Sequence, residues 1–95
     1  MNPLHPEPTY RVSIRATTYR GVDGFVVTAT PYPREYEYFV EGRRYTASHG
    51  GSSRIFTVTR KGAERVRDVF KSGRGSKYIR EATSEILLSE PKRSY

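Results

Sequence analysis

The sequence contains no cysteine, no tryptophan and a single methionine among its 95 residues. Without cysteine the chain has neither a disulfide bond nor a thiolate nucleophile, which fits a cytoplasmic, intracellular protein. No apolar run approaches the roughly 18 residues that a membrane-spanning helix needs, so we expect no membrane insertion. The first nine residues contain three prolines and no apolar stretch, unlike a secretory signal peptide. The length suits one small domain with one core.

Acidic residues are scarce in the middle of the chain. Residues 42–80 contain eleven basic side chains and only two acidic ones, which gives this block a formal charge of +9. Residues 1–41 and 81–95 each carry −1, so the whole net charge of +7 comes from the block. Because charge at this density destabilises a compact domain by self-repulsion, the block is expected to bind an anion. Nucleic acid, either DNA or RNA, is the commonest polyanionic partner.

Apolar and polar residues alternate over residues 10–17, which is the pattern of a half-buried strand, and residues 25–30 are β-branched and aromatic, as in a second strand. In the first of these strands, Tyr10, Val12 and Ile14 share one face. Residues 20–24 and the dipeptide 41–42 predict turns, because each contains glycine where a positive φ is needed. The predicted strands cover residues 10–17, 25–30, 36–40, 43–47 and 54–58.

A helix is predicted to follow these strands. Thr59 suits the N-cap position and Gly73 suits the position just after the last turn. Ala63, Val66 and Phe70 recur at helical spacing between them and predict a core-facing stripe.

The C-terminal element over residues 77–88 fits either a helix, with Ser76 as its N-cap, or a short strand. The predicted fold class is therefore α+β: an antiparallel sheet of four to five strands packed by one helix, with a short C-terminal helix or strand. Residues 10–89 are predicted to form the single domain. A flexible proline-rich tail is expected over residues 1–9, and a polar tail over residues 90–95.

A second stripe of the predicted helix is basic. At roughly 100° per residue, Arg60, Arg67, Lys71 and Arg74 project within about 60° of one another, beside the core stripe. Arginine suits phosphate because its planar fork grips two oxygens at once, and such contacts are expected to dominate over sequence readout. The candidate nucleic-acid contacts are the basic residues of the hairpin, the last strand, the helix and the following turn: Arg43, Arg44, Arg54, Arg60, Arg67, Lys71, Arg74 and Lys77.

Two glycine-rich segments, residues 48–53 and 73–77, also offer backbone N–H groups to an anion. The second is expected to open a helix, where the helix dipole favours negative charge. Neither segment has the spacing of a phosphate-binding P-loop, so the glycines are also read as ordinary turns.

A protein-interaction module is the alternative function, such as a phage or mobile-element protein that binds a host protein or ribonucleoprotein complex. Residues 32–41 favour it, because they mix both signs of charge with aromatic rings, whereas the basic block is nearly one-signed. The same rings also suit stacking with single-stranded bases, or cross-strand pairing within the sheet.

Catalytic residues, cofactors and metal ligands are not predicted. His5 and His49 have no histidine or carboxylate neighbours at metal-ligand spacing. A small ribonuclease built on His49, Arg54, Tyr45 and a glutamate is the lesser alternative. Against it, His49 lies in a loop of glycine and serine, where nothing in the sequence holds its ring in a catalytic orientation.

Residues 53–66 resemble the last wing strand and following helix of winged-helix regulators. Those proteins often read strand, Thr-x-x-Gly and helix, and Thr59 and Gly62 occupy these positions here. The helix-turn-helix that precedes the wing in that family is missing, since the upstream residues read as strands, and so no recognition residues carry over. A three-stranded sheet backed by one helix, as in small integrase-arm domains, fits the element order equally well.

Overall fold

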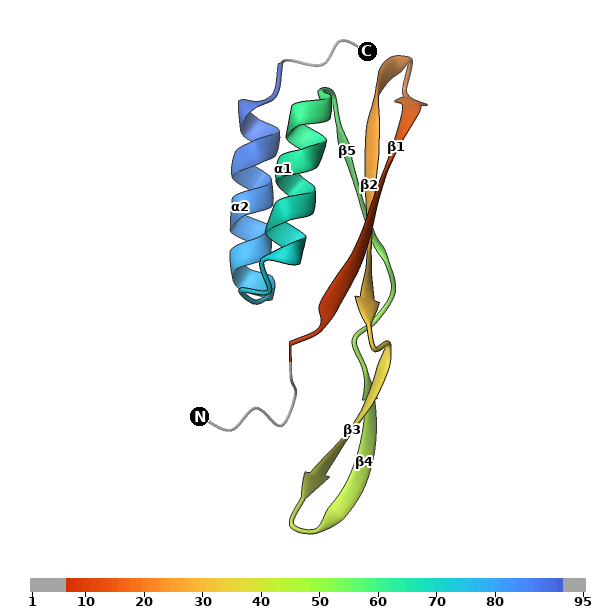
Figure 1. Cartoon of the computed structure of the whole chain (residues 1–95), viewed down its shortest axis with the longest axis vertical. Coiled ribbons are helices and arrows are strands. Elements are labelled where there is room, and N and C mark those ends of the chain that lie inside the picture. Colours follow the sequence, from red (N-terminus) through yellow and green to blue (C-terminus); the bar gives the residue numbers. More distant parts are fainter. Residues whose placement is uncertain (1–6, 92–95) are drawn as a thin grey trace.

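The computed structural model describes residues 7–91, and the remainder of the two predicted tails, with His5, lies outside this range. Five strands are followed by two helices (Figure 1). The elements are β1 (Thr9–Tyr19), β2 (Val22–Tyr32), β3 (Glu35–Val40), β4 (Arg43–Ser48), β5 (Ser53–Thr57), α1 (Arg60–Lys71) and α2 (Ser76–Ser89).

The strands form two antiparallel sheets rather than one. β1, β2 and β5 pair in that order, while β3 and β4 pair only with each other. The predicted α+β class is confirmed, but the prediction of a single sheet of four to five strands is wrong. Pro31 and Pro33 bracket the end of β2 and have no N–H to donate, so its ladder does not continue into β3. After the β3–β4 hairpin the chain returns to the first sheet as β5, whose residues Ser53–Thr57 pair with residues 25–29 of β2.

Two parts of the molecule follow from this topology: an arm of residues 33–49, and a body of residues 7–32 and 50–91. The arm is the β3–β4 hairpin, and it extends from one end of the body to give a molecule of 55 × 22 × 18 Å (Figure 1). The predicted turn at its tip is confirmed. Glu41 and Gly42 have φ of 51° and 80°, the two positive angles of a type I′ turn.

The core of the body lies between α1 and the inner face of the three-stranded sheet. Val66 of α1 and Val27 of β2 have no exposed surface. The rings of Phe70 and Tyr10 meet edge to face, with their centroids 5.0 Å apart. The predicted core stripe is confirmed, because Ala63, Val66 and Phe70 are all buried. The basic side of α1 is therefore fixed relative to the sheet.

The C-terminal element is a helix, α2, and at 14 residues it is longer than α1. The helical reading of this segment is confirmed, and α1 is the helix that packs on the sheet, although the C-terminal helix is not short as predicted. Ser76 is the first helical residue, and Gly75 rather than Ser76 is the N-cap. α2 lies alongside α1 (Figure 1), and Ile79 and Ile86 are buried.

Glu90, the residue after α2, joins the end of that helix to the start of α1. Its carboxylate accepts hydrogen bonds from the N–H groups of Val58 and Thr59 and, at 2.8 Å, from the Thr59 hydroxyl. Thr59 caps α1 as predicted, since its Oγ1 accepts from the N–H of Gly62 at 3.0 Å. A Cβ at Gly62 would overlap the Glu90 carboxylate, so the glycine makes room for this contact. The negative charge lies where the dipole of α1 favours it.

Gly24 lies inside β2, and the turn predicted over residues 20–24 is confined to Arg20 and Gly21. On the outer face of the sheet, which is turned away from the helices, a Cβ at Gly24 would overlap both the backbone carbonyl oxygen of Thr57 and the ring of Phe56. The Tyr19 ring packs on Phe56, with centroids 5.4 Å apart. The glycine thus makes room for this aromatic pair on a face that no helix covers.

Candidate nucleic-acid interface

The eight predicted contact residues are distributed over three surfaces. Arg43 and Arg44 lie near the tip of the arm, at the far end of the molecule from the helices (Figure 1). Arg54 lies on β5, on the outer face of the sheet. The other five lie on or between the helices: Arg60, Arg67, Lys71, Arg74 and Lys77.

One row of basic side chains runs along the side of α1 nearer the sheet. At roughly 100° per residue, Arg60, Arg67 and Lys71 project within about 40° of one another. The guanidinium of Arg60 lies 5.9 Å from the ring centroid of Phe25 in β2, so this row faces the strands. These three residues of the predicted stripe are therefore brought together.

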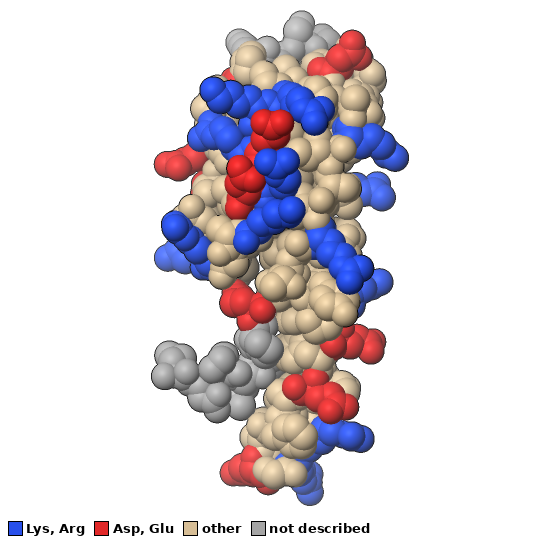
Figure 2. All heavy atoms as spheres, viewed as in Figure 1, with Lys and Arg blue, Asp and Glu red and all other residues tan. Residues whose placement is uncertain are grey.

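A second basic row lies on the side of α1 nearer α2. It consists of Lys61 and Arg65, and Arg65 Nη1 donates a hydrogen bond to the Ser89 hydroxyl at 3.3 Å. Figure 2 shows Lys and Arg gathered over the helices around acidic side chains, whereas both signs are interspersed on the arm.

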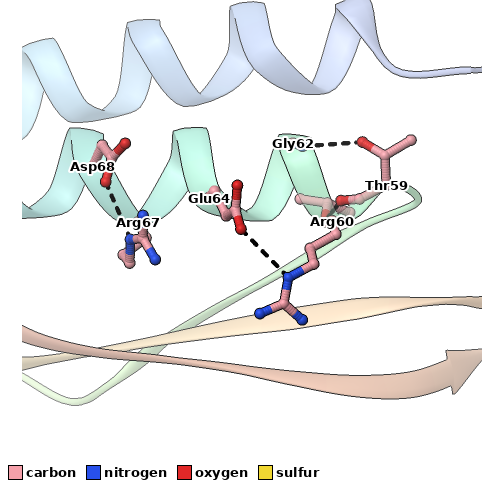
Figure 3. Close-up of polar contacts among 7 residues, drawn as sticks. Thr59, Arg60, Gly62, Glu64, Arg67 and Asp68 are labelled. Atoms are coloured by element: carbon pink, nitrogen blue, oxygen red, sulfur yellow. Dashed lines mark hydrogen bonds and ion pairs between the residues drawn. The ribbon is translucent and has the colours of Figure 1, made fainter.

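Glu64 and Asp68 project between the two basic rows, and each takes part in an ion pair. Arg60 Nε lies 3.3 Å from Glu64 Oε2, and Arg67 Nε lies 3.1 Å from Asp68 Oδ1 (Figure 3). Both pairs are largely exposed, and ion pairs of this kind contribute about 0–1 kcal/mol. The exposed side of α1, over residues 60–71, carries five basic and two acidic side chains and keeps a net charge of +3.

Arg74 departs from the predicted stripe. α1 ends at Lys71, and Gly73 has a φ of 67°, so Arg74 lies in the loop between the helices. Its guanidinium lies 5.0 Å from the ring centroid of Tyr78, in cation–π geometry. The predicted placement is wrong because the left-handed glycine turns the chain away from the helix axis before residue 74.

The turn over residues 73–77 does open a helix, as predicted, but a carboxylate of the protein reaches the N-terminus of α2. Glu7 Oε1 accepts a hydrogen bond from the Ser76 N–H at 3.3 Å. An external phosphate would compete with this contact.

The pKa of Tyr10 is raised above its usual value, mainly because the phenol is buried and secondly because the negative charge of Glu7 lies nearby.

The outer face of the three-stranded sheet is a basic surface that sequence reasoning missed in part. Arg11 and Arg15 of β1 alternate with the core residues of that strand and therefore share this face with Arg54. The guanidinium of Arg11 lies 4.3 Å from the ring centroid of Tyr32. Within residues 7–91 no acidic side chain lies on this face of the strands. The period-two alternation in the sequence of β1 is the pattern that assigns both arginines to the face opposite the core.

The arm differs from these surfaces in charge and composition. It contains three arginines and three glutamates, and Arg44 Nη1 lies 3.7 Å from Glu37 Oε2. One face of the hairpin is aromatic, and its rings form a ladder: Tyr36 stacks on His49 at 4.4 Å, Tyr38 stacks on Tyr45 at 5.5 Å, and the tilted rings of Tyr36 and Tyr38 lie 6.3 Å apart. Arg43 and Arg44 thus belong to a neutral surface of mixed sign.

His49 is held in place, contrary to the expectation from its glycine-rich loop. The backbone N–H of His49 donates to the Arg34 carbonyl at 2.8 Å, and the ring Nδ1 lies 2.7 Å from the Pro33 carbonyl oxygen. Because a carbonyl oxygen only accepts, Nδ1 carries the proton in this contact. The imidazole also stacks on Tyr36, with an interplanar angle of 24°. The hypothesis that nothing orients this ring is wrong, and the partners were missed because they lie at least 13 residues away in sequence.

Two further observations concern residues 7–91. They contain no group of three or more His, Cys, Asp or Glu residues placed to hold a metal ion. Neither helix in this range has the length and apolar character needed to cross a bilayer.

Neither the family models nor the comparisons with curated proteins and with solved structures give a match to this chain.

Proposed function

We propose that the body binds nucleic acid through the phosphate backbone, with little sequence readout. The observation that carries this proposal is the segregation of charge. Within residues 7–91 the body has twelve basic and seven acidic side chains, whereas the arm is neutral. The excess lies on the exposed side of α1 and on the outer sheet face. The outer sheet face has no acidic side chain among the described residues, and the exposed side of α1 carries five basic against two acidic ones, so both surfaces favour a polyanionic partner.

The ion pairs on α1 do not oppose this proposal. Exposed pairs contribute about 0–1 kcal/mol, so a phosphate group can replace Glu64 or Asp68 as the partner of an arginine at little cost. The contact residues that we propose are those of the body: Arg54, Arg60, Arg67, Lys71, Arg74 and Lys77, with the addition of Arg11 and Arg15. Arg43 and Arg44 are left out of this set.

We propose that the binding is non-enzymatic. His49 and Tyr45 share the aromatic face of the arm, whereas Arg54 lies on the body. A ribonuclease would need these groups to surround one scissile phosphate. We expect His49→Ala to leave nucleic-acid binding unchanged and RNA to remain intact in the presence of the purified protein.

Salt dependence is the test of the proposed function. Fluorescence anisotropy would be measured with labelled duplex DNA, duplex RNA and single strands at 50 and 200 mM salt. Contact with six to eight phosphates predicts an affinity that falls roughly a thousandfold or more over this range. An affinity that does not change with salt, or no binding to any of the probes at 50 mM salt, would refute the proposal.

The arm favours a second function, binding of another protein. It mixes both signs of charge, and Phe39 and Tyr45 on it are 58% and 40% exposed. Aromatic residues are enriched at protein interfaces because they bury a large area while tolerating partial contact with water. His49 and Tyr36, and likewise Tyr38 and Tyr45, each cover one face of the other's ring, which leaves less ring surface for stacking on bases.

A further inference from the structure

β5 is an edge strand with an unused side. The order β1–β2–β5 leaves one side of β5 without a neighbouring strand among the described residues. An edge strand of this kind presents unpaired N–H and C=O groups to any strand that can lie beside it. β1, at the other edge, carries Arg11, Arg15 and, just beyond its end, Arg20, whereas β5 carries only Arg54. β5 is therefore the less protected of the two edges.

The helices leave room for a strand beyond β5. α1 packs on β1 and β2, whereas α2 packs on α1 and makes only marginal contact with the strands. Packed helices lie about 8–10 Å apart and neighbouring strands about 4.8 Å apart, so two helices cover about four strands. The three-stranded sheet is therefore one strand narrower than the helical layer above it.

Two hollows mark this vacant position, and we call them together the β5 groove. One, of about 360 Å³, lies between β5 and α2 and is lined by Ile55, Ile79 and Thr83. The other, of about 520 Å³, lies mainly on the outer face of the sheet, from Thr17 and Tyr19 of β1 to Phe56 of β5, and it also reaches Leu87 of α2. Because α2 lies on the opposite side of the sheet from this face, a hollow lined by both reaches round the free edge of β5.

A polar atom in the groove also lacks a partner. Thr83 is 7% exposed, and its hydroxyl has no hydrogen-bond partner among the described residues. A buried hydroxyl without a partner is costly, unless an incoming group supplies one. The ligand of the groove is thus expected to be a strand that is largely apolar on one face and carries a hydroxyl there.

β3 of the arm has this chemistry. Tyr36, Tyr38 and Val40 lie on one of its faces, and Glu35, Glu37 and the exposed Phe39 lie on the other. If β3 were placed beside β5, the Tyr face would pack under α2 and bring phenol hydroxyls into the groove. The Glu face would then lie on the outer side of the sheet, which carries Arg15 and Arg54 and, among the described residues, no acid. The two strands are complementary in both apolar surface and charge.

We propose that two copies of this chain exchange arms, so that β3 of each copy lies along β5 of the other. The arm extends away from its own body (Figure 1), so the occupant of each groove comes from a second molecule. The exchange is reciprocal and closes with twofold symmetry. The proposal rests on the protein-binding reading of the arm. It shares Arg15 and Arg54 with the nucleic-acid proposal, so an exchanged arm and a nucleic acid would compete for the outer sheet face but not for the exposed side of α1.

Charge reversal tests this arrangement without disturbing the core. Analytical ultracentrifugation would be run on wild type, Glu35→Arg, Arg54→Glu and an equimolar mixture of the two variants, without nucleic acid. We expect wild type to sediment at twice the chain mass of 10.9 kDa, and each variant alone to shift toward the chain mass. The mixture should regain the dimer, because the arginine introduced in one chain then meets the glutamate introduced in the other, and the reciprocal pair remains native. Glu41→Arg, at the arm tip, is the matched control and should stay dimeric.

Two results would overturn the proposal. If the wild type is monomeric, the arm does not bind a second copy of this chain and its partner is a different protein. If both single variants remain dimeric, the dimer interface lies somewhere other than the β5 groove. Circular dichroism verifies that the variants are folded, and recovery of the dimer on mixing would itself show that both grooves and both arms are intact.

Discussion

The body and the arm differ in how their apolar side chains are covered. In the body, Val27, Ala29 and Val66 are completely enclosed between the sheet and α1. In the arm, Phe39 and Tyr45 remain 58% and 40% exposed, because two strands alone have no second layer to cover them. The two parts also differ in net charge, because basic residues exceed acidic ones on the body and equal them on the arm. This difference is the basis of our proposal that the aromatic residues of the arm contact another protein.

The largest expected effect concerns two phenylalanines, one in each part. Phe70→Ala removes a buried ring from α1 and should cost roughly 3–5 kcal/mol of unfolding free energy, a large part of the total for a small domain. Phe39→Ala, in the arm, is the matched control and should leave the stability of the body unchanged. Urea unfolding followed by circular dichroism measures both. Equal losses would show that the arm and the body fold as one core.

A smaller effect is expected at the junction of the two helices. Glu90→Gln removes the charge that accepts hydrogen bonds from Val58 and Thr59, and should cost roughly 1.5–3 kcal/mol. Glu81→Gln, on the exposed surface of α2, is the matched control and should change stability very little. If both variants melted at the wild-type temperature, Glu90 would not be fixing α2 to the start of α1.

A pair of glycines tests the outer face of the sheet. Gly24→Ala inserts a methyl group where the Phe56 ring lies, and overpacking of this kind costs roughly 1–3 kcal/mol. A Cβ at Gly51, where the chain returns from the arm to β5, meets no atom within 4 Å. Gly51→Ala should therefore be nearly neutral. A neutral Gly24→Ala would mean that both the Phe56 ring and the backbone at Thr57 readily move aside.

The smallest effect is a pH dependence in the body. The raised pKa of Tyr10 means that the unfolded chain loses this proton at a lower pH than the folded chain does. Stability should therefore fall as the pH rises through about 10, where an unperturbed tyrosine ionises. The melting temperature of the Tyr10→Phe variant should fall less steeply over the same pH range. Parallel pH profiles for the two proteins would contradict this assignment.

Local patterns predicted the parts of this fold that depend on neighbouring residues. The Thr59 cap, the core stripe of α1 and the type I′ turn at Glu41-Gly42 each follow from residues within a few positions. The separation of β3 and β4 from the other strands did not follow, because alternation fixes which face of a strand is apolar but not which strand lies beside it.

The candidate site divides in the same way. The row of Arg60, Arg67 and Lys71 follows from helical spacing and was predictable. The assignment of Arg43 to a neutral arm depends on the sheet topology. The contact of Glu90 with Thr59 spans 31 residues, and no local pattern indicates it.

The central claim is that nucleic acid binds the body and not the arm, and salt-dependent affinity of two matched triple variants tests it most directly. One variant has Arg60, Arg67 and Lys71 changed to Ala, and the other has Arg34, Arg43 and Arg44 changed to Ala, so that each loses three positive charges. The body variant should bind all sequences more weakly, and the slope of log affinity against log salt should become shallower by roughly 3. The arm variant should keep the wild-type slope. A slope that becomes shallower in the arm variant, or an unchanged slope in the body variant, would contradict the account.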